Sequence, residues 1–311
     1  MMRLKQIRLL INNILVYYLP NTFRELLLRV IGKKVIVLNA FINYKYGCFH
    51  RSNWGDDLNY YFLGKLCESN ISLYGTSWYS QLMHKTNYMC IGSFLHEVTP
   101  ETIVWGSGVI SEDESCYAMK CAPKEVLAVR GKLTRRYLLK RGINCPEVYG
   151  DPALLLPLFY PKTNVPPKYK LGIIPHISDL SNKYVEELRS NPEVLIIQMN
   201  HYADWYEIID KICECEVIIS SSLHGIIVSD AYHIPNFWIE FSENIIGNGF
   251  KFKDYYSSVG KEDIKPIRIS SQIDIDFYVK NKCKWIKPVF DPKALLACCP
   301  FPSIRAAVDR I

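Results

Sequence analysis

Short apolar runs alternate with segments of helical spacing along most of the chain. Runs such as those at 35–40 and 217–220 are bounded by polar residues, which is typical of buried strands in a parallel sheet. After Asp56, the apolar residues Leu58, Phe62 and Leu66 recur every four positions, so an amphipathic helix is predicted there. This alternation of strand and helix predicts an α/β fold with parallel strands.

The same pattern places the other elements in two successive units. The first has strands at 88–91, 102–105 and 126–129 and a helix at 131–140. The second has strands at 171–174, 194–198, 217–220 and 236–240 and helices at 182–189, 205–213 and 225–232. Each strand leads into a polar or glycine-containing turn, as in βα units.

A proline-rich stretch separates the two units. Residues 160–170 contain three prolines and no apolar periodicity, a composition typical of linkers. At 311 residues, two domains of ~150 residues are expected. The sequence therefore predicts two Rossmann-like domains, at 1–162 and 163–311, with a cleft between them. The tail at 288–311 is expected to be helical over 292–299 and to pack back across the domain boundary.

The first 34 residues precede the first predicted strand. Their apolar run at 9–19 is broken by Asn12 and Asn13, is too short to span a bilayer, and is not followed by a small-residue cleavage site. Basic residues stand on both sides of the run. The segment is therefore predicted to form one or two basic amphipathic helices, which either lie on an anionic membrane surface or pack on their own domain.

Composition narrows the functional classes. A net charge of +6 fits acidic small molecules or an anionic membrane, and it is too small and dispersed to indicate a nucleic-acid partner. The eleven cysteines include no C-x-x-C pair, so the cysteine spacing typical of zinc sites is missing. A reduced, cytoplasmic setting is the simpler interpretation of these cysteines. No metal or cofactor is required.

The strand-to-helix turn at 220–225 reads Ser-Ser-Ser-Leu-His-Gly. Open parallel sheets bind ligands at such carboxyl ends of strands. The hydroxyls of Ser221 and Ser222 could bind an anion at the helix N-terminus, and His224 has the pKa range of a general acid or base. No G-x-S-x-G elbow is present, which argues against a serine hydrolase.

Three further strand ends carry polar residues. Gly55 would let a ligand approach the backbone beside Asn53 and Asp56, although Asp56 could equally be a simple helix cap. His176 follows the strand at 171–174 and could face the same cleft as His224. Arg130 stands between a strand and a helix, where it could bind a carboxylate or phosphate bidentately or form a surface ion pair.

Lysines alternate with aromatic residues after the strand at 236–240. Lys251 and Lys253 could supply positive charge to a ligand in the cleft or lie on a solvated strand face. Glu240 ends the preceding strand and could bind a donor.

Taken in order, these segments resemble the polysaccharide pyruvyl transferase family. The segments that carry the resemblance are Asn53-x-Gly55-Asp56, Gly106-Ser107-Gly108, Val129-Arg130-Gly131 with Thr134, Gly150-Asp151-Pro152-Ala153, Ile174-Pro175-His176 with Asp179, Ser221-Ser222-Leu223-His224-Gly225 with Asp230-Ala231 and Ile234-Pro235, and Phe250-Lys251-Phe252-Lys253-Asp254-Tyr255. One departure is Ser222, which stands where a common form of the motif has an arginine before Leu-His-Gly.

The resemblance implies a GT-B-like enzyme that transfers pyruvate from phosphoenolpyruvate, its co-substrate, to a glycan or lipid-linked oligosaccharide. It implies that the C-terminal domain binds the donor, that His224 is the general acid or base, that Arg130 holds the donor, and that His176 assists. The substrate-binding residues it implies are Asn53, Gly55, Asp56, Gly106, Ser107, Asp151, Ser221, Ser222, Leu223, Gly225, Glu240, Lys251 and Lys253.

Two other functions fit the same predicted fold. One is a GT-B glycosyltransferase that uses a nucleotide sugar and binds its ribose through Glu240. The other is a non-catalytic glycan-binding relative, which Ser222 makes conceivable. For the transferase we expect a cytoplasmic location, either free or peripheral on the inner face of the membrane.

Overall fold

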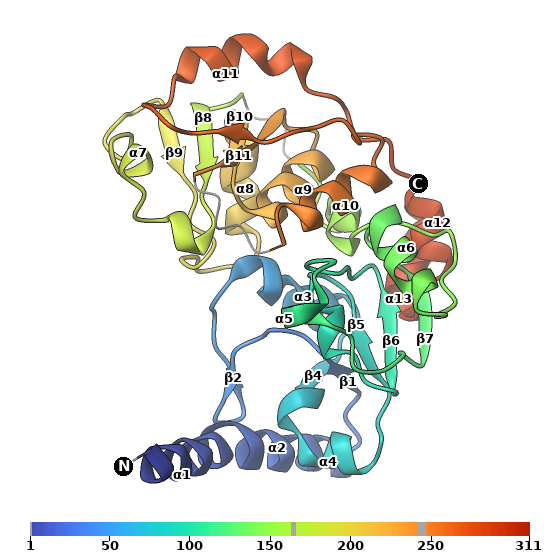
Figure 1. The fold of residues 1–311 in the computed structure, drawn as a ribbon. Coiled ribbons are helices and arrows are strands. Elements are labelled where there is room, and N and C mark those ends of the chain that lie inside the picture. The colour runs from blue at the N-terminus through green and yellow to red at the C-terminus, as the bar shows by residue number, and fades with distance from the viewer. Residues whose placement is uncertain (1, 163–165, 242–246) are drawn as a thin grey trace.

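Two parallel five-stranded sheets form the framework of the computed structural model, which describes residues 2–162, 166–241 and 247–311 (Figure 1). The first sheet contains β1 (Val35–Leu38), β4 (Asn70–Leu73), β5 (Asn87–Met89), β6 (Thr102–Trp105) and β7 (Glu125–Ala128). The second contains β8 (Tyr169–Ile174), β9 (Val194–Ile196), β10 (Cys215–Ser220), β11 (Asn236–Glu240) and β12 (Ile267–Arg268). The predicted α/β fold with two Rossmann-like units is confirmed.

Both sheets have the same strand order. The first runs β4-β1-β5-β6-β7 and the second β9-β8-β10-β11-β12, which in each case is the 2-1-3-4-5 order of doubly wound folds of the flavodoxin type. The order reverses between β1 and β5 in the first sheet and between β8 and β10 in the second. Ligands of such sheets bind outside the carboxyl ends of the strands at this reversal.

Helices connect and cover the strands. In the first unit these are α3 (Trp54–Leu66), α4 (Trp78–Leu82), α5 (Glu114–Tyr117) and α6 (Lys132–Lys140), with a small hairpin of β2 (Tyr44–Lys45) and β3 (Cys48–Phe49). In the second they are α7 (Lys183–Glu186), α8 (Glu207–Cys213), α9 (Leu223–Ala231), α10 (Phe250–Ser258) and α11 (Ile275–Asn281). Strands β4 and β12 were not predicted, because one has the polar-interrupted sequence Asn-Ile-Ser-Leu and the other is only two residues long.

The C-terminal tail returns to the first sheet. Helices α12 (Pro292–Ala297) and α13 (Pro302–Arg305) lie beside β6 and β7 in Figure 1. The indole Nε1 of Trp105 donates a hydrogen bond of 3.0 Å to the carbonyl oxygen of Leu295, and Phe301 packs on Tyr88. The predicted return of the tail is confirmed. Residues 163–165 of the predicted linker lie outside the described residues, so the exact domain limits stay a prediction.

A long N-terminal helix lies along the end of the first domain that is remote from the second (Figure 1). It consists of α1 (Met2–Asn13), a π-helical segment η1 (Ile14–Tyr18) and α2 (Leu19–Val30), which confirms the helices expected before residue 34. Among the helices described, none combines the length and apolarity needed to cross a membrane.

Candidate active site at the two strand-order reversals

The first turns of α3 and α9 are in direct contact. A Cβ atom placed on Gly55 would lie 1.7 Å from Nδ1 of His224, so the imidazole ring occupies the space that any other residue at position 55 would fill. Helix α3 follows β1, and α9 follows β10. Strands β1 and β10 each border the point where their sheet reverses strand order. The contact between α3 and α9 therefore brings together the expected ligand site of the first sheet and that of the second.

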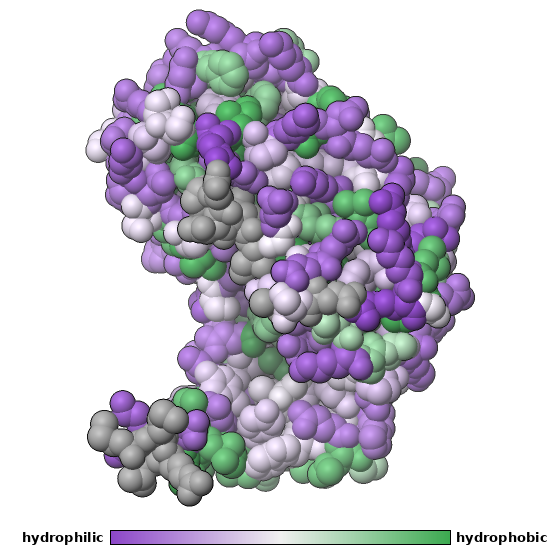
Figure 2. Space-filling view, in the orientation of Figure 1, coloured by the Kyte–Doolittle hydropathy of each residue, from purple (hydrophilic) through white to green (hydrophobic). Residues whose placement is uncertain are grey.

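Helix α3 is fixed to the second domain by hydrogen bonds. The backbone N–H of Trp54 donates to the carbonyl of Met199 at 2.7 Å, and its indole Nε1 donates to the carbonyl of Trp205 at 2.6 Å. The hydroxyl of Tyr202 donates to Oδ2 of Asp57 at 2.7 Å. The outline of the molecule narrows where the two domains meet (Figure 2), and these contacts hold Gly55 against His224 at that level.

The cap of α3 is Asn53 rather than Asp56. Its side-chain oxygen accepts from the N–H of Gly55 at 3.3 Å, and its amide donates to Oδ2 of Asp56 at 2.8 Å. The alternative of Asp56 as the simple cap is therefore wrong: its carboxylate lies within the first turn, beside the cap. This leaves Asp56 available to a ligand.

Burial changes the acid–base behaviour of Asp56. It raises the pKa of this carboxyl to about 7, and the neighbouring Asp57 raises it further, whereas Lys251 and the amide of Asn53 act in the opposite direction. A carboxyl group with such a pKa can both donate and accept a proton near neutral pH. Sequence reasoning missed this property, because the burial of Asp56 depends on the docking of the second domain.

Lys251 is the cation that faces this group, and it lies on α10. The interpretation of a solvated strand face is thus wrong. Burial lowers the pKa of Lys251 to about 8, aided by the charge of Arg130, whereas Asp56 and Asp179 raise it. Lys253 is exposed on the same helix, and its Nζ donates to the carbonyl of Asn248 at 3.4 Å. The structure therefore separates the two lysines: Lys251 interacts with Asp56, whereas Lys253 lies on the exposed side of α10.

The imidazole of His224 is surrounded by positive charge. Burial lowers its pKa to about 3, and Lys251, Arg130 and His176 each lower it further. His224 is therefore neutral near pH 7 in this form of the protein. The neutral ring can accept a proton. It can act as a general acid only after it has been protonated, which requires an anion that offsets the surrounding cations.

His176 and Ser221 are joined by hydrogen bonds at the ends of β8 and β10. The N–H of His176 donates to Oγ of Ser221 at 2.9 Å, and this hydroxyl donates to Oδ2 of Asp179 at 2.7 Å. Burial, followed by Lys251, lowers the pKa of His176, whereas Asp179 raises it. The Ser221 hydroxyl thus links the ends of these two strands to Asp179, and its binding of an anion stays a prediction.

Ser222 occupies the N-cap position of α9, and among the described residues its side chain makes no capping hydrogen bond. The neighbouring Leu223 is buried and Gly225 is packed closely, because a Cβ there would lie 2.5 Å from Oγ of Ser220. Leu223 and Gly225 therefore shape the turn, while the N–H groups of the first turn of α9 supply the positive end of the helix.

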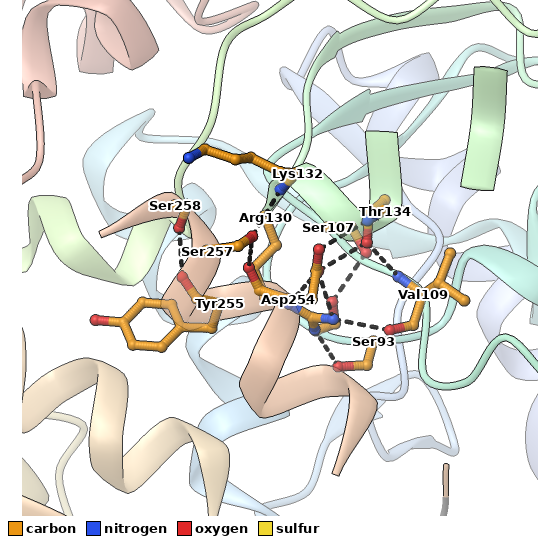
Figure 3. A network of polar contacts seen from close by, with 11 residues as sticks. Ser93, Ser107, Val109, Arg130, Lys132, Thr134, Asp254, Tyr255, Ser257 and Ser258 are labelled. Carbon is orange, nitrogen blue, oxygen red and sulfur yellow. Dashed lines mark hydrogen bonds and ion pairs between the residues drawn. The ribbon is translucent and has the colours of Figure 1, made fainter. Parts of the chain in front are cut away.

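Arg130 is enclosed rather than open to a ligand (Figure 3). Its side chain is 0% exposed, and it is paired with the carboxylate of Asp254 on α10 at 2.9 Å. A further terminal nitrogen donates to the carbonyl of Val109 at 2.7 Å, and the other donates to Oγ of Ser93. This corrects the expectation of a bidentate grip on the donor, and also the alternative of a surface ion pair. Asp254, which belongs to a segment that carries the resemblance but was assigned no role, holds α10 against the first domain.

The segment around Arg130 explains three other predicted residues. Gly106 has φ +96°, and a Cβ there would lie 2.3 Å from Cδ of Pro152. The carbonyl of Ser107, a buried residue, accepts from the N–H of Arg130 at 3.2 Å. Asp151 is buried and caps the next turn through the N–H of Ala153 at 3.0 Å; burial raises its pKa to about 7. Gly106, Ser107 and Asp151 thus support the backbone around Arg130, and their assignment as substrate contacts stays a prediction.

Glu240 is not among the charges that shift the pKa values of Asp56, Lys251, His224 or His176. Burial raises the pKa of its carboxyl, while Arg268 and Lys253 lower it; none of the cluster residues is among these charges. The groups brought together are thus Asp56, Lys251, His224, His176 and Asp179, around the first turn of α9.

A family model matches most of the chain. The model describes polysaccharide pyruvyl transferases and covers residues 9–243, a range that includes all of this cluster except Lys251. The chain belongs to the polysaccharide pyruvyl transferase family. It is therefore a pyruvyltransferase, whose acceptor is in general terms a polysaccharide, and the resemblance inferred from its motifs is confirmed.

Curated relatives and a solved structure are similar to this pyruvyltransferase. An uncharacterized protein of Acanthamoeba polyphaga mimivirus is 29% identical over 68% of this chain and 72% of its own length. Succinoglycan biosynthesis protein ExoV of Rhizobium meliloti (strain 1021) is 28% identical over 52% of this chain and 50% of its own length. A functionally uncharacterized protein from Klebsiella pneumoniae covers 80% of this chain and 97% of its own, with 12% identity and a TM-score of 0.43. The GT-B-like arrangement stays a prediction.

Proposed function

We propose that this pyruvyltransferase takes pyruvate from phosphoenolpyruvate and joins it to two hydroxyl groups of a glycan as a cyclic ketal, releasing phosphate. The observation that carries the proposal is the contact of Gly55 on α3 with His224 on α9, together with the charge of Lys251, which acts on both His224 and Asp56. Phosphoenolpyruvate carries a carboxylate and a phosphate, which the ammonium group of Lys251 and the N–H groups of the first turn of α9 could bind.

Donor binding would change the protonation of His224. The pKa of its imidazole is lowered to about 3 by burial and by neighbouring cations. A bound trianion would favour the imidazolium form and raise that pKa toward neutrality. His224 would then be charged only when the donor is present, which ties its action as a general acid to an occupied site.

The reaction needs one proton delivered and two removed. In the proposal, His224 protonates the methylene carbon of the donor, and a glycan hydroxyl attacks the adjacent carbon after giving its proton to Asp56. The bond from that carbon to the phosphate oxygen breaks, phosphate leaves, and a second hydroxyl closes the ketal. The proton of the second hydroxyl leaves with phosphate, and the proton held by Asp56 restores His224, so that both groups return to their starting states. His176, whose pKa is lowered by burial and by Lys251, assists the leaving phosphate.

The acceptor of this proposal is a glycan, either free or carried as a lipid-linked oligosaccharide at the inner face of the membrane. In the alternative glycosyltransferase reaction Glu240 would bind the donor, whereas the family match supports pyruvyl transfer.

Donor identity is the direct test. The purified protein is incubated with phosphoenolpyruvate and a panel of glycans, and phosphate release is followed together with the mass of each glycan. We expect acceptor-dependent phosphate release and a glycan heavier by pyruvate less one water. Nucleotide release from a sugar nucleotide, or binding of phosphoenolpyruvate without turnover for every acceptor, would overturn the proposal.

A further inference from the structure

Helix α2 is oriented with its polar face inward and its apolar face outward. Glu25 is fully buried and accepts hydrogen bonds from the hydroxyls of Ser72, Ser77 and Ser80 at 2.7, 2.6 and 2.8 Å. Asn21, also buried, donates to the carbonyl of Tyr44 at 3.1 Å. A helix that packs on a soluble domain normally places its apolar stripe inward. Here these buried polar contacts fix the opposite orientation.

The outward side chains form one apolar face from the end of α1 to the end of α2. The residues of this outer face are Ile11, Leu15, Leu19, Phe23, Leu26 and Val30, all exposed. Phe23 and Val30 are 68% and 83% exposed, so nothing in the described chain covers them. Apolar side chains are visible along this edge of the molecule, over α2 and α4 (Figure 2). Contiguous exposed apolar surface of this kind marks a site of association.

The π-helical segment keeps these residues on a single side. In a regular α-helix, with 3.6 residues per turn, residues four apart drift steadily around the axis. Between Ile14 and Tyr18 the helix is π-helical, and the N–H of Leu19 bonds to the carbonyl of Ile14. This wider turn takes up an extra residue, so it offsets the drift at the middle of the face. The outer face therefore extends from α1 into α2 without passing to the other side.

All of the net charge of the protein lies in this segment. Residues 1–34 contain seven of the 37 lysines and arginines but only one of the 31 acidic residues, the buried Glu25. The remainder of the chain has 30 of each and is neutral. Lys5 and Arg8 are exposed on α1 itself. An apolar helical face with basic residues beside it matches the surface of an anionic bilayer.

Neighbouring elements support the same orientation. Leu82 and Met83, at the end of α4, are 78% and 55% exposed, and α4 packs beside α2. Tyr18 of η1 stacks on Trp78 of α4 with ring centroids 5.4 Å apart, and tyrosine and tryptophan favour the headgroup level of membranes. A second copy of the chain would bring like charges together across the face, which disfavours it as the occupant.

We propose that the outer face of α1, η1 and α2 lies on an anionic phospholipid surface. The helix then holds the enzyme flat on the membrane, with the second domain directed away from it (Figure 1). The site lies between the domains, so the reacting sugar is held away from the lipid. This suits an oligosaccharide chain on a lipid carrier rather than a single headgroup sugar, a consequence that rests on the proposed function, whereas the membrane contact does not.

Vesicle sedimentation of the full chain tests the contact without any substrate. Vesicles of phosphatidylcholine alone are compared with vesicles that also contain phosphatidylglycerol. We expect binding to the anionic vesicles, reduced by salt, and at least roughly tenfold weaker binding by Phe23→Glu/Val30→Glu. Lys5→Glu/Arg8→Glu should weaken binding to anionic vesicles by about tenfold or more. The matched control is Val289→Glu, at a 75% exposed apolar residue outside this face, which should bind as the wild type does.

Each other outcome counts against the contact. Equal sedimentation of wild type and Phe23→Glu/Val30→Glu would overturn it, as would no binding to either vesicle. A dimer in light scattering that Phe23→Glu/Val30→Glu dissolves, without vesicle binding, would assign the face to a second copy. Thermal unfolding shows whether each variant is folded. Pyruvyl transfer is scored separately on a free oligosaccharide, so failure of the proposed reaction and failure of the membrane contact give different results.

Discussion

Helix α10 carries two buried charges whose surroundings differ. Asp254 meets Arg130, and the guanidinium donates to Asp254, Val109 and Ser93, so this pair is satisfied by the protein itself. Lys251, three residues earlier, faces Asp56 and two histidines, and the pKa values of all these groups are displaced from their usual ranges. A buried charge with complete partners holds a structure together, whereas charges that shift one another without complete partners are poised for a ligand.

The sharpest test of the second region is Asp56→Asn. Asparagine keeps an oxygen that can accept from Asn53 but cannot take a proton from an acceptor hydroxyl. We expect pyruvyl transfer to fall by about 10²- to 10⁴-fold with little change in the temperature of unfolding, measured by initial rates and by thermal denaturation. Transfer at the wild-type rate would remove Asp56 from the chemistry.

The first region is tested by stability rather than by rate. Arg130→Met leaves the Asp254 carboxylate buried without its partner, and removing one member of a buried pair costs about 3–5 kcal/mol. We expect a loss of this size in the free energy of unfolding from denaturant titration. The double variant with Asp254→Asn should recover part of it, because no unpaired charge remains. A fully additive double variant would mean that the two residues do not act as a pair.

Sequence and structure agree where chemistry is local. The strand ends with His176 and His224, and the glycine beside Asp56, could be predicted because a βα turn places polar residues next to their strand. What could not be predicted is which side chain turns inward once distant segments meet. From the sequence, Arg130 could be accessible to a ligand. In the structure it is paired with Asp254, which lies 124 residues later in the chain. Likewise the pKa of Asp56 depends on Lys251 and on burial by the second domain.

The contact between α3 and α9 offers a steric way to disturb the second region alone. In Gly55→Ala the new Cβ would lie 1.7 Å from Nδ1 of His224, so the ring must move, and a misplacement of about 1 Å can cost about 10²-fold in rate. We expect a loss of roughly 10- to 100-fold in transfer. Gly64→Ala, on the same helix, is the control: its Cβ would lie 3.4 Å from Ile71, an ordinary contact, and its rate should not change.

The smallest effect at neutral pH, and the most specific, concerns Lys251. If Asp56 must be ionised and Lys251 protonated, the pH profile of kcat/KM rises near the pKa of Asp56, about 7, and falls near that of Lys251, about 8. In Lys251→Arg the cation persists at higher pH, because a guanidinium does not lose its proton. The falling limb should therefore move upward while the rising limb stays, with only a modest loss at pH 7. Lys253→Arg, on the exposed side of α10, should leave both limbs in place; a shift in that variant would mean that the falling limb reports the overall charge of the helix and not the lysine that faces Asp56.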